Sequence, residues 1–208
     1  MPYYELWTIL GSWKSEFSSE DFASVFPSPN PRKVLSDMSI MGFLKREGRG
    51  RYKVVEATNF AKSKTNVDEA YNLLKRSRLP YALTDVDSVF VWTNGGYNAN
   101  RFFGSYPIYL RVPRSNLDDW RNYLESNGKE CTLRGERPKK TLYGTYYLLS
   151  PEEKIESTSI NSLNVDSLEK TVDFCLAESY TYEPALEMLD KAYNLGLGTR
   201  YADAEIIV

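Results

Sequence analysis

Asp85 and Asp87, in the segment TDVDS (84–88), have the spacing of the carboxylate pair with which nucleotidyltransferases hold Mg²⁺. Hard divalent cations prefer carboxylate oxygens, so such a pair could support metal-dependent catalysis. The Gly-Ser turn expected roughly ten residues upstream is missing, because YNLLKRSRLP (71–80) stands there. A helix N-terminus is the simpler explanation, since its dipole favours acidic side chains and Thr84 with Asp87 fits a capping box. We therefore predict no catalytic residue, metal or cofactor, with a divergent Mg²⁺-dependent nucleotidyltransferase as the alternative.

A second cluster consists of cations, in the segment GFLKREGRGRYKVV (42–55). Its Lys and Arg side chains surround the glycines of the turn, although the whole chain has a net charge of −2. The charge is unevenly distributed: it is +1 over residues 1–56, +5 over 57–150 and −8 over 151–208. The sequence therefore predicts a local cationic surface within a slightly acidic protein.

Three helices are expected before this segment. Apolar residues at helical spacing predict the first helix over residues 3–16. A capping box at Ser18 and Asp21 predicts a short second helix. Asn30 caps a third helix, which Gly42 ends. The side chains of the first and third helices that we expect to face the core are Leu6, Ile9, Leu10, Trp13, Val34, Leu35, Met38 and Met41.

The third helix is followed by a strand, a glycine-containing turn and a second strand. Three helices and a basic hairpin in this order predict a winged helix-turn-helix over residues 1–58. In such a module the third helix lies in the DNA major groove and the hairpin, or wing, contacts the backbone or minor groove. A solvated hairpin whose charges prevent edge pairing is the alternative. The residues that we predict to contact double-stranded DNA are Arg32, Lys33, Ser36, Ser39, Lys45, Arg46, Arg49, Arg51 and Lys53.

Residues 59–208 predict a small mixed α/β domain with helices at its C-terminal end, so the expected fold class of the chain is α+β. A strand over 105–114, a helix over 115–128 and two further strands form the core of that prediction. The capping box at Thr84 and Asp87 favours a helix within residues 81–93 that stops at Gly95, whereas the composition of SVFVW (88–92) leaves a strand as the alternative. Residues 152–167 are predicted to form a loop, with a short hidden strand as the alternative.

Two other regions could bind partners. Tyr143, Tyr146 and Tyr147, beside the basic loop 134–140, could stack on single-stranded nucleic acid. Aromatic residues of a strand more commonly belong to a core, and we favour that interpretation. The acidic residues 151–208 could dock a basic protein, although a solvated helical face is the simpler explanation.

The composition excludes several classes of site. The chain has no histidine, which removes every catalytic or metal site that depends on imidazole. Cys131 and Cys175 match no metal motif and are predicted to be reduced thiols. No apolar run approaches the ~18 residues of a membrane span, and the N-terminus lacks the basic start of a signal peptide. We expect a cytoplasmic protein without a membrane partner.

Three segments resemble archaeal members of the AbiEi-like antitoxin family: GRGRYKV (48–54), LPYALTDVDSVFVWTNGGYN (79–98) and YPIYLRVPRSNLDDWRNYLESNG (106–128). In that family a winged helix precedes an α/β domain described as nucleotidyltransferase-like. The resemblance implies a DNA-binding autorepressor, not an enzyme, that opposes a nucleotidyltransferase toxin of a type IV pair without a stable complex. Only the DNA-contacting positions carry over, and Asp85 departs from the small residue common at its place. Repressors often read two half-sites, which is compatible with a homodimer.

Overall fold

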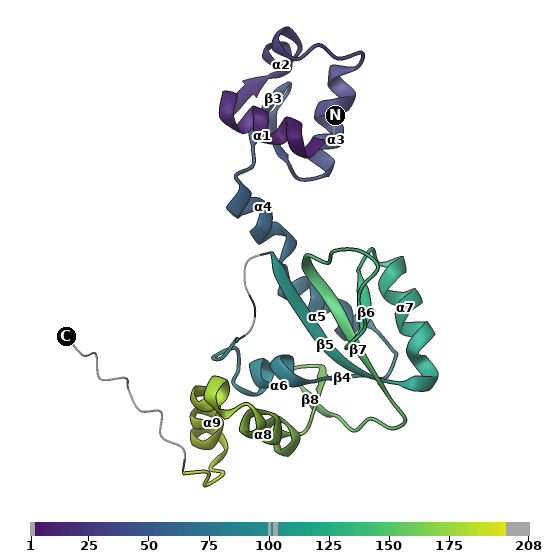
Figure 1. The fold of residues 1–208 in the computed structure, drawn as a ribbon, viewed down its shortest axis with the longest axis vertical. Helices are drawn as coiled ribbons and strands as arrows, with labels where there is room; N and C mark the ends of the chain where they lie inside the picture. Colours follow the sequence, from purple (N-terminus) through teal and green to yellow (C-terminus); the bar gives the residue numbers. More distant parts are fainter. Residues whose placement is uncertain (1–2, 100, 102–103, 199–208) are drawn as a thin grey trace, which may run out of the picture. The chain divides into compact units, whose positions relative to one another are not determined.

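The computed structural model describes residues 3–99, 101 and 104–198, and the fold is a mixture of helices and two sheets, of the α+β class (Figure 1). The chain divides into two compact units, Met1–Lys64 and Thr65–Val208. Each unit has its own hydrophobic core.

The first unit combines helices with a small antiparallel sheet. Strand β3 is central in that sheet, and its order is β1-β3-β2. The elements in chain order are α1 (Tyr3–Trp13), β1 (Glu16–Ser18), α2 (Ser19–Val25), α3 (Pro31–Ile40), β2 (Leu44–Gly48), β3 (Arg51–Val54) and α4 (Ala57–Lys64).

Local signals in the sequence fix the ends of α2 and α3. The hydroxyl of Ser18 accepts a hydrogen bond from the Asp21 N–H at 3.0 Å, and the Asp21 carboxylate accepts one from the Ser18 N–H at 2.9 Å. The side chain of Asn30 accepts a hydrogen bond from the Lys33 N–H at 3.0 Å. Gly42 follows α3 with φ of +85°, a conformation that costs glycine little. The predicted caps of both helices are therefore confirmed.

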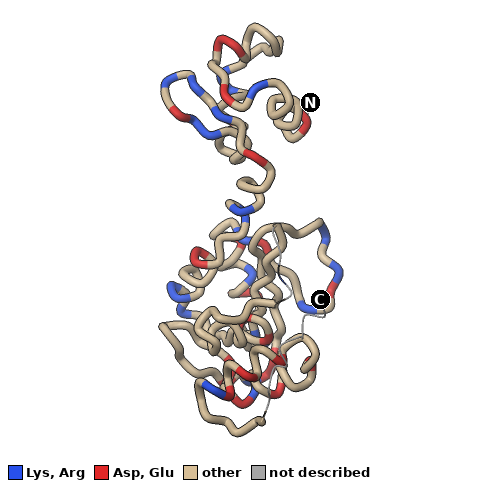
Figure 2. The backbone as a smooth tube through the Cα atoms, turned by 90° about the vertical axis from the view of Figure 1, so that its left-hand side faces the viewer, with Lys and Arg blue, Asp and Glu red and all other residues tan. Residues whose placement is uncertain are grey.

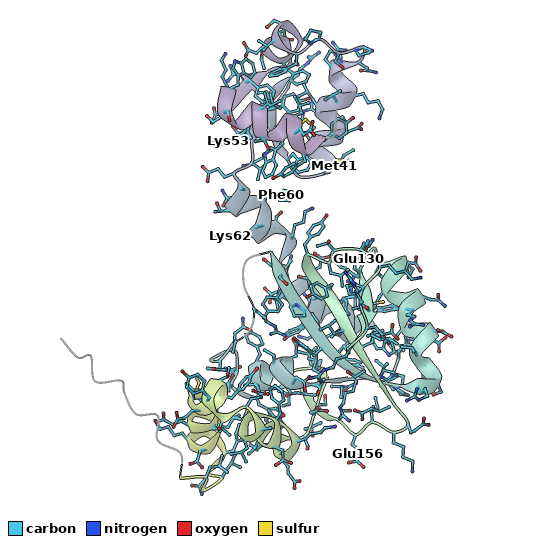
Figure 3. All side chains as sticks on the ribbon, viewed as in Figure 1. Met41, Lys53, Phe60, Lys62, Glu130 and Glu156 are labelled. Atoms are coloured by element: carbon cyan, nitrogen blue, oxygen red, sulfur yellow. The ribbon has the colours of Figure 1, made fainter. Side chains whose placement is uncertain are left out.

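Aromatic side chains dominate the core of the first unit. Trp7 stacks on Phe43 with ring centroids 5.0 Å apart. Phe60 of α4, labelled in Figure 3, stacks on Phe43 at 5.1 Å. Leu35 and Met38 of α3 are fully buried in the same cluster. Because Phe60 belongs to this core, α4 folds with the first unit. The division therefore falls after Lys64, where the sequence analysis placed it after residue 58.

The second unit is built on a mixed sheet with the order β6-β7-β5-β4-β9-β8. Strand β7 is parallel to both of its neighbours, β4 is parallel to β9, and the remaining pairs are antiparallel. The elements are α5 (Val67–Arg76), β4 (Ala82–Leu83), α6 (Asp85–Trp92), β5 (Ser105–Pro113), η1 (Arg114–Asn116), α7 (Leu117–Ser126), β6 (Cys131–Leu133), β7 (Gly144–Glu152), β8 (Thr158–Ile160), β9 (Leu163–Val165), α8 (Leu168–Ala177) and α9 (Ser179–Tyr193).

Alternation along β5 separates two hydrophobic clusters in this unit. Ile108 and Leu110 are fully buried in one cluster with side chains of α5 and α7. Tyr109, which points to the opposite face, packs against a second cluster built from α6, α8 and α9. Helices therefore cover both faces of this strand.

Short strands account for most of the differences from the sequence prediction. Strands β1 and β4 were not predicted, and the hairpin β8-β9 lies in the segment expected to be a loop. Residues 81–93 contain both β4 and α6, so the helix prediction there is confirmed, and Gly95 ends the helix with φ of +80°. Ile9 and Met41, expected in the core, are 43% and 46% exposed. Within the described ranges, no helix has the length and apolar character needed to cross a bilayer.

Candidate nucleic-acid interface

The residues predicted to contact DNA lie on α3 and on the β2-β3 hairpin, two elements that contact each other in the first unit. Arg32, Lys33 and Ser36 are exposed on α3, whereas Ser39 is half-buried. All five cations of the hairpin are exposed, and Figure 2 shows several blue Lys and Arg segments along its two strands, with one red acidic segment among them. The structure therefore places most of the predicted set at the surface.

Two of the four candidates on α3 are engaged within the helix itself. Lys33 Nζ lies 2.9 Å from an Asp37 oxygen, and this hydrogen bond raises the pKa of Lys33. The Ser39 hydroxyl donates to the Leu35 carbonyl at 2.8 Å. Arg32 lies in the first turn, where the helix dipole also favours an anion. Arg32 and Ser36 are thus the α3 groups best placed for an external ligand.

Part of the hairpin charge is balanced by carboxylates. Lys53 Nζ lies 2.9 Å from Glu16 on the neighbouring strand β1, and that hydrogen bond raises the pKa of Lys53. Lys45 lies 3.8 Å from Glu47. Arg46 Nε donates to the carbonyl of Gly48 at 3.2 Å. Phosphate binding by these side chains would compete with the contacts that they already make.

Arg32, Arg49 and Arg51 differ from the other cations. Within the part of the chain that the structure describes, their side chains form no hydrogen bond or ion pair. An exposed guanidinium without a partner offers its full set of donors to an anion and loses no internal contact on binding. These three arginines are the strongest candidates for phosphate contacts.

The tip of the hairpin is held in place by a backbone contact with α2. The Ser19 N–H donates to the Gly50 carbonyl at 2.8 Å, and Ser18 pairs with Arg51 in the β1-β3 ladder. Gly50 has φ of +71°, and a Cβ added there would lie 3.0 Å from the Ser19 hydroxyl. Arg49 and Arg51 therefore extend from an anchored turn, which lowers the entropy cost of fixing them on a ligand.

Asp87, one member of the possible metal-binding pair, is fully buried, and three partners occupy its carboxylate. The Tyr71 hydroxyl donates to it at 2.5 Å, the Tyr109 N–H donates at 2.7 Å, and Arg101 Nη2 lies 2.5 Å away. Thr84 is the N-cap of α6 but makes no side-chain capping bond, so the predicted capping box is wrong. Asp87 is instead a structural anion of the core.

Asp85 points to a different partner, the guanidinium of Arg134 in the basic loop that follows β6. Its side chain is 12% exposed, and burial raises its pKa, an effect that Arg134 opposes. Over residues 3–99, 101 and 104–198, no three His, Cys, Asp or Glu side chains are grouped so that they could hold a metal ion. The geometry thus favours ion-pairing roles for Asp85 and Asp87 over a shared Mg²⁺ site.

The three tyrosines considered for stacking on nucleic acid differ in how deeply they are buried. Tyr147 is fully buried, and its hydroxyl donates to the Ala70 carbonyl at 3.1 Å. Tyr146 is half-buried, and Tyr143 is 64% exposed. Tyr147 cannot form a stacking platform with the other two, because it belongs to the core as the sequence analysis favoured.

Sequence reasoning missed the carboxylates that neutralise part of the basic surface. The pairing of Lys33 with Asp37 is at i,i+4 spacing, so it could have been recognised on a predicted helix. The pairing of Lys53 with Glu16 spans 37 residues and depends on the unpredicted strand β1, so no local signal indicates it. A prediction from local patterns therefore counts more hairpin cations as available to DNA than the structure leaves without an ion pair.

No family model matches this chain, and no curated protein matches it. The resemblance to AbiEi-like antitoxins thus remains an expectation from the sequence. A functional proposal for the first unit therefore has to be argued from the exposed arginines on its surface.

Proposed function

We propose that residues 1–64 form a winged helix-turn-helix that binds duplex DNA, and that the protein is a transcriptional regulator. The element order α1-β1-α2-α3-β2-β3 and the sheet order β1-β3-β2 support this proposal, since they fit a third helix followed by a wing. In this arrangement α3 enters the major groove and the β2-β3 hairpin follows the adjacent backbone.

The observation that carries the proposal is the trio of exposed, unpaired arginines, Arg32, Arg49 and Arg51. The first unit has ten Lys and Arg against seven Asp and Glu, a net charge of +3, within a protein of net charge −2. A positive unit in a slightly acidic chain directs a polyanion to that unit. Arg32 would bind a phosphate at the start of α3, and the two wing arginines would bind phosphates or a narrow minor groove.

The finer assignment rests on the resemblance to AbiEi-like antitoxins. It makes the protein an autorepressor that binds the DNA upstream of its own gene. Its functional counterpart is a nucleotidyltransferase toxin with which it forms no stable complex. Two half-sites would be read by a homodimer.

Fluorescence anisotropy with the full chain tests DNA binding. Labelled duplex from upstream of the gene is compared with a scrambled duplex at several salt concentrations. Preferential binding is expected, and log Kd should rise steeply with log salt, by about 0.9 per phosphate contact. Equal binding to both duplexes would leave a non-specific DNA-binding protein, and no binding at low salt would refute the proposal.

Paired variants test the wing. Arg49→Ala with Arg51→Ala should weaken binding and reduce the salt slope by about two, because two phosphate contacts are lost. The control removes two cations from the acidic C-terminal region, Lys154→Ala with Lys191→Ala, and should leave the slope unchanged. Equal losses in both double variants would indicate an effect of net charge rather than a wing.

A further inference from the structure

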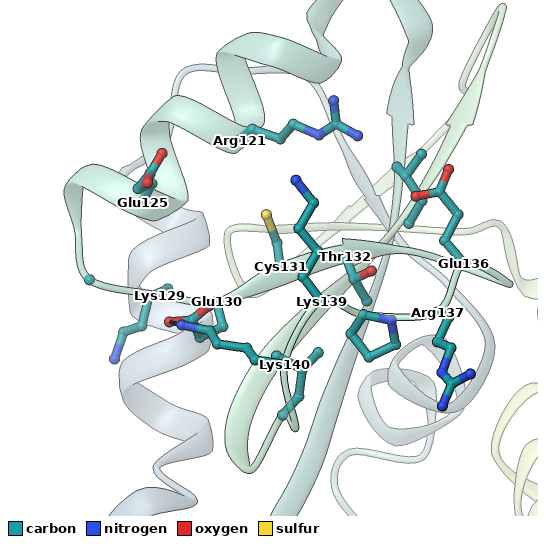
Figure 4. Close-up of a pocket in the computed structure, with 14 residues that line it drawn as sticks. Arg121, Glu125, Lys129, Glu130, Cys131, Thr132, Glu136, Arg137, Lys139 and Lys140 are labelled. Carbon is teal, nitrogen blue, oxygen red and sulfur yellow. Dashed lines mark hydrogen bonds and ion pairs between the residues drawn. The ribbon is translucent and has the colours of Figure 1, made fainter.

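A groove of ≈ 930 Å³ lies in the second unit, beside the edge strand β6 (Figure 4). Helix α7 and its C-terminal turn form one wall, and the loop of residues 134–142 forms another. The side chains and backbone that line it are Arg121, Glu125, Gly128, Lys129, Glu130, Cys131, Thr132, Leu133, Glu136, Arg137, Pro138, Lys139, Lys140 and Leu142. Its size lies within the range of roughly 300–1,000 Å³ found for small-molecule sites.

Ion pairs within the unit already neutralise two of the lysines that line the groove. Lys140 Nζ lies 2.7 Å from Glu130, and Lys129 Nζ lies 2.6 Å from Glu69 of α5. Both cations are thus held by carboxylates. They are poor first choices for an additional anion, because binding would have to displace a contact already made.

Arg121, Arg137 and Lys139 remain as the less committed cations of the groove. Among described residues, Arg137 and Lys139 form no ion pair, and Arg121 makes one long contact of 3.4 Å to Asp118, which is 89% exposed. Figure 4 shows the side chains of Arg121 and Lys139 directed into the same part of the groove, beside Cys131. Two cations that face one region repel each other unless an anion lies between them.

The remaining lining offers an apolar surface next to these cations. Leu133 and Leu142 line the groove together with Pro138 and Cys131. A groove with an apolar wall and a cationic end suits a ligand that has a flat organic part and a charged phosphate. Glu125, Glu130 and Glu136 also line it, and their charges would repel a continuous polyanion. A single nucleotide fits this distribution better than a nucleic-acid strand does.

We propose that this groove binds a nucleoside monophosphate. Its phosphate lies between Arg121 and Lys139, and its base lies against Leu133, Pro138 and Leu142. The site belongs to the second unit and does not depend on DNA binding by the first. Asp85 and Asp87 are not among the residues that line the groove, so it differs from the nucleotidyltransferase site considered from the sequence.

Isothermal titration calorimetry on the full chain tests the proposal with AMP, GMP, CMP and UMP in turn. Saturable binding of at least one of them is expected, whereas the matching nucleoside and inorganic phosphate alone should bind at least about tenfold more weakly. Inorganic phosphate that binds as tightly as the nucleotide would reduce the site to a general anion site. Absence of binding by all four nucleotides at millimolar concentration would overturn the proposal.

Variants locate the binding in the groove. Arg121→Gln with Lys139→Gln should weaken nucleotide binding at least about tenfold, since two charge-assisted contacts are lost. The control, Lys75→Gln with Arg78→Gln, removes two exposed cations elsewhere in the same unit and should bind as the wild type does. Equal weakening in both variants, or binding of a single-stranded oligonucleotide in place of mononucleotides, would contradict the assignment.

A second measurement needs no variant. Cys131 lines the groove, whereas Cys175 is fully buried in another cluster. Bound nucleotide should slow alkylation of Cys131 by iodoacetamide, and the absence of label at Cys175 in the same mass spectrum shows that the protein has stayed folded. An unchanged rate at Cys131 with saturating nucleotide would place the ligand elsewhere.

Discussion

Arg101 Nη2 lies 2.5 Å from Asp87 Oδ2, and the exposed fractions of these two side chains are only 1% and 0%. Burial raises the pKa of Asp87, an effect opposed by Arg101 and by the hydrogen bond from the Tyr109 N–H. Burial is the largest single effect on Arg101 and lowers its pKa, but the charge and hydrogen bond of Asp87, together with the hydroxyl groups of Tyr106 and Tyr71, outweigh burial and leave that pKa raised. This pair connects α6 to the segment before β5. The sequence analysis had instead expected Asp87 to cap the start of a helix together with Thr84.

Asp87→Asn should strongly destabilise the second unit. The variant leaves the Arg101 charge buried without its counterion, which typically costs about 3–5 kcal/mol in the free energy of unfolding. Urea denaturation followed by circular dichroism measures the change. Asp118→Asn is the control, because its ion pair with Arg121 is at the surface and its loss should change stability little. Similar stabilities of the two variants would contradict the structural role of Asp87.

Asp85→Asn should stabilise the protein at neutral pH relative to the wild type. Burial raises the pKa of Asp85 above its unfolded value of 3.8, so its stabilising contribution is fully present below pH 3.8 and is lost as pH rises through the folded pKa. Arg134, 52% exposed, remains solvated when its partner is neutral. Asparagine also tolerates the left-handed backbone at this position, where φ is +51°. Urea midpoints at acidic and neutral pH should show an advantage of the variant that grows with pH.

The opposite sign is expected for Asp21→Asn. The hydrogen bond from the Ser18 N–H lowers the pKa of Asp21, so this carboxylate stabilises the fold above its unfolded pKa, and that contribution is lost as pH falls through the folded pKa. The variant should be less stable than the wild type at neutral pH, and the difference should shrink in acid. The same pH trend in both variants would contradict the assignment of burial as the dominant effect at Asp85.

Gly50→Ala should destabilise the first unit by about 1–2 kcal/mol, the cost of a left-handed conformation for a residue with a Cβ. The added Cβ would also approach the Ser19 hydroxyl to 3.0 Å and disturb the contact between hairpin and α2. Gly48→Ala is the matched control, because its φ is not positive and no atom lies within 4 Å of the added Cβ. Thermal unfolding of the two variants should separate them, and equal midpoints would argue against the anchored turn.

Alkylation should distinguish the two cysteines, both of which are free thiols. Cys175 is fully buried, and burial raises its pKa to about 12, so the reactive thiolate is scarce at neutral pH. Cys131 is half-buried, and its pKa is also raised by burial. Mass spectrometry should find slow labelling of Cys131 and labelling of Cys175 only in denaturant. Equal rates in the native protein would contradict this order.

The sequence by itself determined the features that depend on neighbours along the chain. The caps at Ser18 and Asn30, the end of α3 at Gly42 and the long strand around Ile108 follow from contacts within a few residues. The α+β class also follows, because helical and strand periodicities are written locally. The same local patterns predicted that the cations lie on α3 and on the hairpin, where most of them are exposed.

Tertiary structure alone decided which of these groups are free and which are engaged. Glu16 forms an ion pair with Lys53 because β1 pairs with β3. In the core, Asp87 forms an ion pair with Arg101 and accepts a hydrogen bond from the Tyr71 hydroxyl. These partners lie 14 to 37 residues apart, and strands as short as β1 carry too little pattern to reveal their pairing. Burial and charge pairing depend on such non-local contacts, so the chemistry of each side chain appears only in the folded chain.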